Sequence, residues 1–482
     1  MVDVHGINRI VPGDAGLLAN RAIVAVYIAG LLCLLFSFGG VTDLPKAIGY
    51  GLIAISGAFA VLIKGVPAHT KNIFNSALII VSILSVWIFA QTLPSDLLGN
   101  SVWDSARALG VDGTKTISVA SGDTFNSILN VSGPFITFLA VLIIFPNDED
   151  VRRALRIAAY FLSVLVLFGL IQYGLFPDAL LFSQKSAYVG SLTSVFVNRN
   201  TAGTFLGLVA LVFVVWFCEV ARLCRLRYNL DRFANGVPLN LGRAHLELLA
   251  AAIMFLLAVL SLLLTQSRGA MASFVLAVAC FIVLAAFYPV DIAGSGMERR
   301  RVSLAGRFLR LAIILGIAVA GLALFGGRTV LRAQVAGGED ARFCVLPGLL
   351  EMADDRWLTG WGFGTFRVAF SAYRDPHCGL YGAWVRAHNV YLEGYAGLGI
   401  LFWPLVVVGV GVCGVAFWRG IRNRRSMRLY AHLGLCGMIL TLLHSAIDFS
   451  LQIPGYAATF ASFLALMIAV SAGKAVKKRR FS

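Results

Sequence analysis

The first stretch of the chain that could do chemistry is VFVNRNTAGTF, which places Asn198, Arg199 and Asn200 side by side. Two amides and a guanidinium offer several hydrogen bonds to an anionic or hydroxylated ligand. A helix cap is the simpler interpretation, because the side chain of Asn200 or Thr201 can accept backbone N–H bonds at the start of a helix. Three polar side chains exceed what a cap requires, so both interpretations stay open.

The second stretch is TQSRGA, in which Ser267 and Arg268 occupy a very short turn between two apolar segments. Such a turn holds the guanidinium near the membrane surface, and arginine binds a phosphate through two parallel hydrogen bonds. Anchoring of a helix at the headgroups is the alternative. We therefore take Ser267 and Arg268 as candidate phosphate-binding residues.

The third stretch is ARFCVLPGLLEMADDRWLTGWGFGTF, where Arg342 begins a predicted amphipathic segment, Phe343 to Met352. The stretch ends in a flexible aromatic turn, GWGFG. Trp361 in this turn could stack on a sugar or lie among the lipid headgroups, and the sequence does not decide between the two. The acidic pair at 354 and 355 is typical of a solvated surface, so no metal site is expected.

The fourth stretch, RAHNVYLEGYAGLGILFW, places Arg386, His388 and Asn389 at the edge of an apolar segment. We predict His388 in the first turn of a membrane-spanning helix, where the positive helix end and nearby arginines favour the neutral imidazole. A neutral imidazole can take a proton from a hydroxyl, although a histidine with satisfied interfacial hydrogen bonds is the alternative. Asp448, in LLHSAIDFSLQIPG, is expected to pair with an arginine or to cap the turn before Pro454.

Strongly apolar segments separate these polar clusters. Of the 482 residues 59% are apolar and 13% charged, and the mean hydropathy is +0.83, which excludes a soluble protein. A membrane-spanning helix needs about 20 apolar residues. We predict an all-α polytopic membrane protein with about 12 transmembrane helices, near residues 21–40, 47–63, 73–93, 127–145, 154–174, 202–220, 246–264, 269–289, 309–326, 388–417, 430–447 and 454–473.

The charge distribution predicts the orientation. The net charge of +16 comes from 40 Lys and Arg against 24 Asp and Glu. Most of these cations lie on one side if both termini are cytoplasmic, as the positive-inside rule requires. All four polar clusters then lie on the outer, periplasmic side. A long outer loop, 327–387, is the exception because it holds seven arginines, Arg328, Arg332, Arg342, Arg356, Arg367, Arg374 and Arg386.

These spans predict three regions: an N-terminal transmembrane bundle of about five helices at 1–190, a core at 191–473 that includes the loop 327–387, and a basic cytoplasmic tail at 474–482. The first span is expected to be retained, with no soluble domain appended. Neither a P-loop nor a Rossmann glycine pattern occurs, and no nucleic-acid partner is expected. Cys344 and Cys378 are the two cysteines of the outer loop, and we predict a disulfide between them.

The ordered set FVNRNTAG, SRG, Arg342 followed by GWGFGTF, HNVYLEGYAGLG and HSAIDFSLQIP resembles the O-antigen ligase and polymerase family of bacterial membrane glycosyltransferases. The resemblance covers residues 196–455. It implies a C-type glycosyltransferase fold with a large helical periplasmic loop. Arg268 and Arg342 would hold the diphosphate, and His388 would be the acceptor-activating base. The chain departs from the family's pattern at Gly397, where an acidic residue is frequent.

The activity implied by this resemblance needs neither metal nor cofactor. A glycan would move from an undecaprenyl-diphosphate-linked donor to a hydroxyl of a glycan or lipid A-core acceptor, at the periplasmic face of the inner membrane. The sequence does not separate a ligase from a polymerase, and it gives neither the sugar, the linkage nor the oligomeric state. A flippase for the same lipid-linked glycan is the alternative, but charges deep within the spans would then be expected. Here they gather at the outer rim.

Overall fold

The computed structural model describes residues 14–225, 229, 235, 242–290, 345–378 and 384–473. Within these residues, eleven helical segments are long and apolar enough to cross a membrane. Each corresponds to one predicted span, while the predicted span 309–326 lies outside the described residues. The chain is therefore a polytopic, predominantly helical membrane protein, as predicted.

The N-terminal region contains α1 (Asp14–Phe36), α2 (Asp43–Lys64), α3 (Lys71–Ala90), α4 (Val102–Ala108), α5 (Ser121–Asn126), α6 (Ile128–Ile144) and α7 (Asp148–Leu175). A hairpin follows, with β1 (Ala179–Leu180) antiparallel to β2 (Ser183–Gln184). The α-helices that follow in the described part of the chain are α8 (Arg199–Leu223), α10 (Arg243–Leu264), α11 (Arg268–Phe287), α15 (Leu346–Asp355), α16 (Phe366–Ala369), α17 (Val390–Leu398), α18 (Phe402–Asn423), α19 (Arg428–Ser445) and α20 (Pro454–Ala472).

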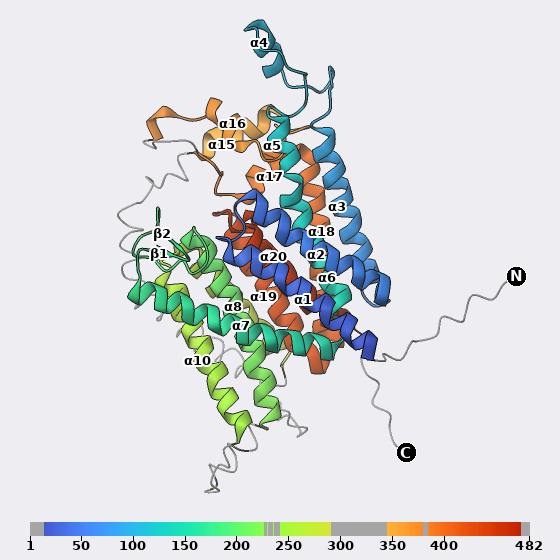
Figure 1. Ribbon diagram of the computed structural model, residues 1–482, viewed down its shortest axis with the longest axis vertical. Helices are drawn as coiled ribbons and strands as arrows, with labels where there is room; N and C mark the ends of the chain where they lie inside the picture. The colour runs from blue at the N-terminus through green and yellow to red at the C-terminus, as the bar shows by residue number, and fades with distance from the viewer. Residues whose placement is uncertain are drawn as a thin grey trace, which may run out of the picture.

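The centre of the molecule is formed by α8, α19 and α20, most of whose residues are buried. Figure 1 shows these helices surrounded by the N-terminal helices on one side and by α10 on another. Glycines let the central helices approach closely. A Cβ at Gly434 would lie 2.3 Å from the ring of Phe417, and one at Gly437 would lie 2.4 Å from the ring of Phe463.

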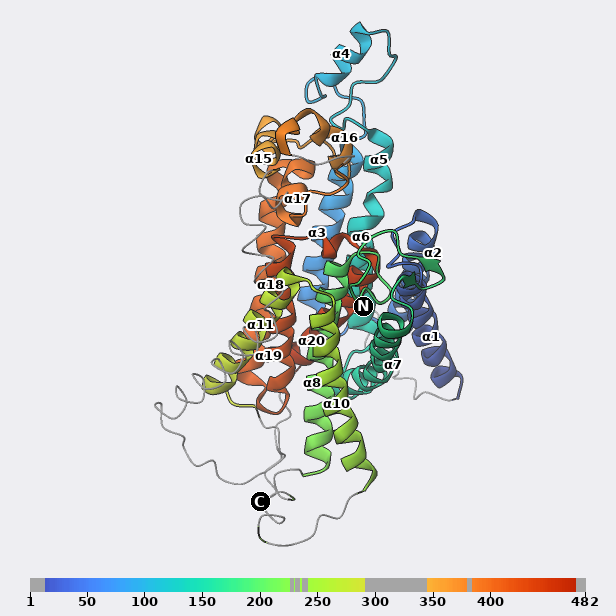
Figure 2. The same ribbon diagram turned by 90° about the vertical axis from the view of Figure 1, so that its left-hand side faces the viewer.

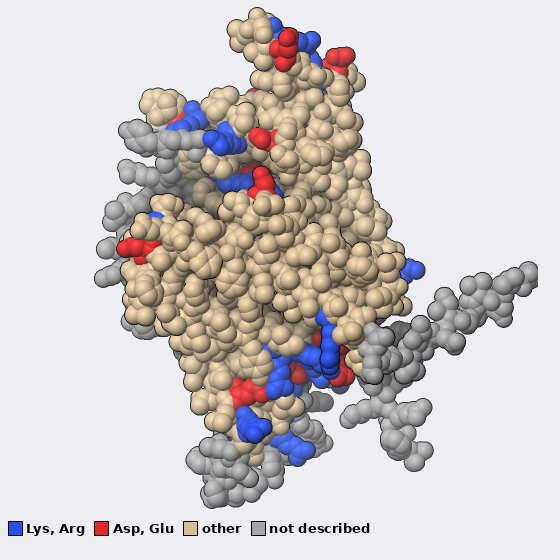
Figure 3. Space-filling view, viewed as in Figure 1, with Lys and Arg blue, Asp and Glu red and all other residues tan. Residues whose placement is uncertain are grey.

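Charged side chains gather towards the two ends of the molecule. Figure 3 shows a broad band of uncharged residues between them, as expected for a surface that faces lipid. At one end, α7 begins with pairs such as Arg153–Glu149, with 3.0 Å between their nitrogen and oxygen atoms, and Asp148 pairs with Arg424 at the end of α18. The opposite end carries α4, α15 and α16 (Figure 2).

The predicted span 388–417 is two helices. It breaks at Gly399, whose φ of 67° lies in the left-handed region, and a 3₁₀ turn over Gly399–Leu401 joins α17 to α18. A Cβ at Gly399 would lie 2.3 Å from the carbonyl oxygen of Leu358, and one at Gly360 would lie 2.4 Å from that of Gly397. The break therefore interlocks with the loop that precedes α16, and only glycine fits there.

The aromatic turn GWGFG is held against the membrane-spanning helices. The backbone N–H of Trp361 donates to Ala396 O at 2.8 Å, and the side chain of Gln91 donates to Thr359 O and Gly397 O at 2.8 Å each. Gly397, at which the resemblance would lead one to expect an acidic residue, thus lies where the aromatic turn packs against α17. The amphipathic segment predicted from Phe343 to Met352 is α15, which runs from Leu346 to Asp355; Phe343 is outside the described residues.

Candidate functional site

The polar side chains at the start of α8 divide into a cap and a network. Asn198 is the cap, because its Oδ1 accepts the backbone N–H of Asn200 at 2.7 Å; the predicted cap at Asn200 or Thr201 is wrong. The buried Asn200 side chain is left to bond elsewhere. Its Oδ1 accepts from Ser267 Oγ at 2.9 Å, and its Nδ2 donates to Asp448 Oδ1 at 2.9 Å. Asn200 therefore joins two distant motifs.

The turn that carries Arg268 is fixed on α8. Ser267 caps α11 by accepting the backbone N–H of Ala270 at 3.4 Å. Gly203 of α8 faces this turn, and a Cβ there would lie 2.8 Å from Cβ of Ala270. Arg268 is the first residue of α11 and its side chain is exposed. The predicted short turn is confirmed, with the guanidinium attached to a rigid support.

Asp448 lies between α19 and α20 and is fully buried. Its carboxylate accepts hydrogen bonds from Asn200 Nδ2 and from Ser450 Oγ, and His388 Nδ1 lies 3.7 Å from its Oδ1. The predicted partners of this carboxylate were an arginine or the turn before Pro454. The hydroxyl of Ser450 belongs to that turn, and the other two contacts are to an amide and an imidazole. Burial raises the pKa of Asp448, but His388, His444 and Ser450 together bring it below its ordinary value. The carboxylate is therefore ionised at neutral pH.

His388 is not in the first turn of a helix, contrary to prediction. It lies two residues before α17 with a φ of 54°, because Asn389 is the cap and accepts two backbone N–H bonds at 3.0 Å each. The left-handed backbone turns the ring away from the helix and towards Asp448. Phe449 and Trp384 contact it edge-on at 4.8 and 5.7 Å between ring centroids, and 23% of the side chain remains exposed. A substrate can therefore reach this imidazole.

A second histidine supports the network and was missed by the sequence analysis. His444, buried at the end of α19, lies with Nδ1 at 2.6 Å from Thr204 Oγ1, and the same hydroxyl contacts Ser450 Oγ at 3.2 Å. Gly269 packs on the ring, since a Cβ there would lie 3.0 Å from His444 Cδ2. The sequence signal was weak: Thr204 lies one helical turn after Asn200 on α8, but Asp448 lies beyond the end of α19 and shares no helix face with His444.

An ion pair holds the segment that precedes His388. Arg386 Nη1 donates to Glu393 Oε1 at 3.1 Å, and the backbone N–H of Ala387 donates to Glu393 Oε2 at 2.8 Å. Glu393 is buried on α17 and was also missed. Since Glu393 binds both residues that come just before His388, it fixes the position of the imidazole. Arg386 thus has a supporting role, and its binding role stays a prediction.

The other predicted site residues lie apart from this network or beyond the described part of the chain. Arg199 stacks on Tyr188, with 5.4 Å from its Cζ to the ring centroid. Trp361 donates its Nε1–H to Met352 O at 2.7 Å and meets Tyr373 edge-on at 5.6 Å between ring centroids, so it holds α15 in place. Arg342 and Cys344 lie outside the described residues, so the diphosphate role of Arg342 and the disulfide between Cys344 and Cys378 stay predictions.

Side-chain contacts among Ser267, Asn200, Asp448 and His388 form a network that joins four of the five motifs. A path runs from Ser267, beside Arg268, through Asn200 and Asp448 to His388. An exposed guanidinium can hold an anion, and an imidazole beside an ionised carboxylate can take a proton and keep it. This arrangement suits a reaction in which an anionic group leaves while a hydroxyl is deprotonated.

Comparison with known proteins gives one family match. Residues 253–403 match the model of the family described as O-Antigen ligase. No curated protein matches the chain. The matched segment begins within α10, includes both Arg268 and His388, and ends at the start of α18. Residues 253–403 are therefore an O-antigen ligase family domain.

Proposed function

We propose that this O-antigen ligase family protein transfers a glycan from an undecaprenyl-diphosphate-linked donor to a hydroxyl of a glycan or lipid A-core acceptor, at the periplasmic face of the membrane. One observation carries the proposal: a solvent-accessible imidazole lies 3.7 Å from a buried carboxylate, and that carboxylate is joined through Asn200 to the turn that bears Arg268. The same two residues, His388 and Arg268, fall inside the matched family domain.

The reaction that these groups support is a single displacement. The acceptor oxygen attacks the anomeric carbon of the donor sugar, and the bond from that carbon to the diphosphate oxygen breaks. The electron pair leaves with undecaprenyl diphosphate, whose charge Arg268 and Arg342 stabilise. The hydroxyl proton passes to His388, and Asp448 stabilises the resulting imidazolium. The reaction as proposed requires no metal, so transfer should continue in the presence of EDTA.

Hydrogen bonds hold both reacting side chains in place for this displacement. Ser267 and Asn200 fix the turn of Arg268, and Asn389 and Glu393 fix the segment of His388. Both reacting groups are thus held by capped helix ends, so little motion is needed to align them. The donor and the acceptor would meet at the end of the bundle that carries α15 and α16, which we propose is periplasmic.

The experiment that tests this function is glycolipid analysis of a deletion strain complemented with wild-type or variant protein at equal protein level. Accumulation of long undecaprenyl-linked chains would identify a ligase, and accumulation of single repeat units with loss of polymer would identify a polymerase. His388→Ala and Arg268→Ala should fail to complement. Arg342→Lys should fail as well, because an ammonium cannot form the two parallel hydrogen bonds. Full complementation by His388→Ala would overturn the proposed role of this histidine.

A further inference from the structure

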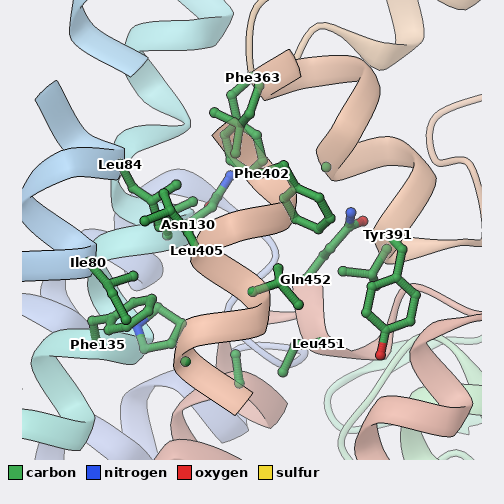
Figure 4. A pocket seen from close by; sticks show the side chains of 18 of the residues that line it. Ile80, Leu84, Asn130, Phe135, Phe363, Tyr391, Phe402, Leu405, Leu451 and Gln452 are labelled. Atoms are coloured by element: carbon green, nitrogen blue, oxygen red, sulfur yellow. The ribbon is translucent and has the colours of Figure 1, made fainter. Parts of the chain in front are cut away.

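A cavity of about 360 Å³ lies beside the site, and none of the network residues Ser267, Asn200, Asp448 and His388 lines it. It lies among α3, α6, α18 and α20, all of which belong to candidate membrane spans. Its walls are almost entirely hydrocarbon (Figure 4). The side chains that form them include Ile80, Leu84, Phe135, Phe402 and Leu405.

Polar side chains line the cavity in two groups: Ser76, Asn130 and Thr365 lie apart from His388 in the chain, and the others lie near it in the chain or follow Asp448. Arg386 and Tyr391 line it from either side of this histidine, and Glu393 lines it from the next turn of α17. Gln452 lines it as well, with its amide between the rings of Phe402 and Tyr391 in Figure 4. Its Oε1 is buried and has no hydrogen-bond partner within the described residues. An acceptor atom in this situation is suited to the hydroxyl of a bound ligand.

The cavity and Arg268 lie on different sides of α19. Met438 and Leu442 of α19 line the cavity, whereas Leu440 and His444 of the same helix pack against glycines of α8 and α11. Among the described residues that line the cavity, none comes from α8, α10 or α11. Two ligands could therefore approach His388 at once, one from the side of Arg268 and one from the cavity.

We propose that this cavity holds the hydrocarbon chain of the acceptor, while the donor diphosphate binds on the side of Arg268. The inference rests on the proposed function, because it assigns the second substrate of the same site. The acceptor would be a membrane lipid with a long hydrocarbon chain and a polar glycan head. The chain fills the apolar cavity, and the head extends past Gln452 and Arg386 towards His388. Acyl chains and polyprenyl chains share this chemistry.

The test fills the cavity from one helix without touching the catalytic network. Gly409 of α18 lines the cavity, and a Cβ there would meet only Ile80 Cδ1, at 3.9 Å. Gly411 is exposed on the same helix, does not line the cavity, and a Cβ there would meet nothing within 4 Å. Gly409→Trp therefore places an indole in the cavity, and Gly411→Trp is the matched control with the same added bulk.

The Michaelis constants for donor and acceptor should be measured separately for wild type and both variants. We expect Gly409→Trp to raise KM for the acceptor at least tenfold and to leave KM for the donor within twofold. Gly411→Trp should leave both within twofold. A rise in donor KM alone would mean that the donor chain occupies the cavity, and unchanged constants would mean that neither chain does. Either result would overturn the assignment.

Photo-crosslinking gives a readout that does not depend on activity. The full-length protein in nanodiscs would be exposed to a diazirine-labelled lipid A or to a diazirine-labelled polyprenyl phosphate, and the labelled peptides mapped. One of the probes should label peptides around Ile80 or Leu405 in wild type and in Gly411→Trp, but not in Gly409→Trp. Labelling by the lipid A probe would indicate a ligase acceptor. Labelling by the polyprenyl probe alone would indicate a polymerase acceptor if Gly409→Trp also raises KM for the acceptor, and would overturn the assignment if it raises KM for the donor alone.

The two proposals fail in different ways in this design. If wild type transfers glycan but neither probe labels the cavity, the cavity assignment is wrong and the proposed function stands. If a probe labels the cavity but wild type transfers nothing to any lipid acceptor, the cavity binds a lipid chain and the proposed function is wrong.

Discussion

Replacing the buried carboxylate beside His388 with an amide should remove most of the transfer activity. In Asp448→Asn the side chain keeps its shape and one oxygen acceptor, but it loses its charge. The charge lies 3.7 Å from His388 Nδ1, and Coulomb's law gives about 4 kcal/mol for unit charges at that separation with an effective dielectric constant of about 20. Exposure of 23% of the His388 side chain reduces this figure. We therefore expect a loss of about 10²-fold to 10³-fold in rate.

The assay is the single-turnover rate of glycan transfer as a function of pH. Activity in wild type should fall at low pH as the base becomes protonated. In Asp448→Asn the rate should be lower across the profile, because the imidazolium formed during proton transfer loses its anionic neighbour. The pKa of Asp448 is lowered in the folded protein, so its contribution to stability is complete above the ordinary pKa of an aspartate and is lost only in strong acid. Protonation of Asp448 therefore cannot produce the fall in activity at low pH.

A matched control separates the charge from the hydrogen bonds. Ser450→Ala removes the hydroxyl that donates to Asp448 but keeps the carboxylate. One neutral donor contributes about 1 kcal/mol, so we expect a loss of less than about tenfold and an unchanged pH profile. Asp448→Asn with a rate within threefold of wild type would refute the reasoning.

Three further substitutions test the roles of Arg268, Gly399 and Trp361. Arg268→Lys should lower kcat/KM for the donor at least about tenfold, because it removes the parallel hydrogen bonds to the diphosphate; the steady-state assay checks this. Gly399→Ala should lower the free energy of unfolding by at least about 2 kcal/mol, since its Cβ would lie 2.3 Å from Leu358 O, whereas Gly411→Ala should not; thermal unfolding in detergent compares them. Trp361→Phe should cost about 1 kcal/mol of stability through the lost hydrogen bond and leave both KM values within threefold. A tenfold rise in KM for the donor or the acceptor, with an unchanged Tm, would instead show that Trp361 stacks on a bound sugar.

Features that depend on residues close together in the chain were predicted well. Hydropathy over about 20 residues locates a membrane span, and all eleven described spans were expected. The turn at Arg268 followed from the short gap between two apolar runs. Both properties are local, so they can be recognised in the sequence without knowledge of the packing.

Features that depend on packing between distant segments were not predicted. Thr204 and His444 are 240 residues apart, and each is unremarkable in its own helix until α8 and α19 come together. The break at Gly399 requires the loop around Leu358 to lie against it. The predicted position of His388 was wrong for a local reason: Asn389 caps α17, so His388 lies before the helix with a left-handed φ of 54°. Its approach to Asp448 is the part that depends on packing between distant segments.

The most direct test of the central claim is transfer of a radiolabelled glycan from an undecaprenyl-diphosphate-linked donor by the purified protein in lipid vesicles, with wild type compared with His388→Ala. The account predicts that wild type releases one undecaprenyl diphosphate for each glycan transferred. It also predicts that His388→Ala binds the donor equally well but transfers it at least about 10²-fold more slowly. Transfer by His388→Ala at the wild-type rate would contradict the account.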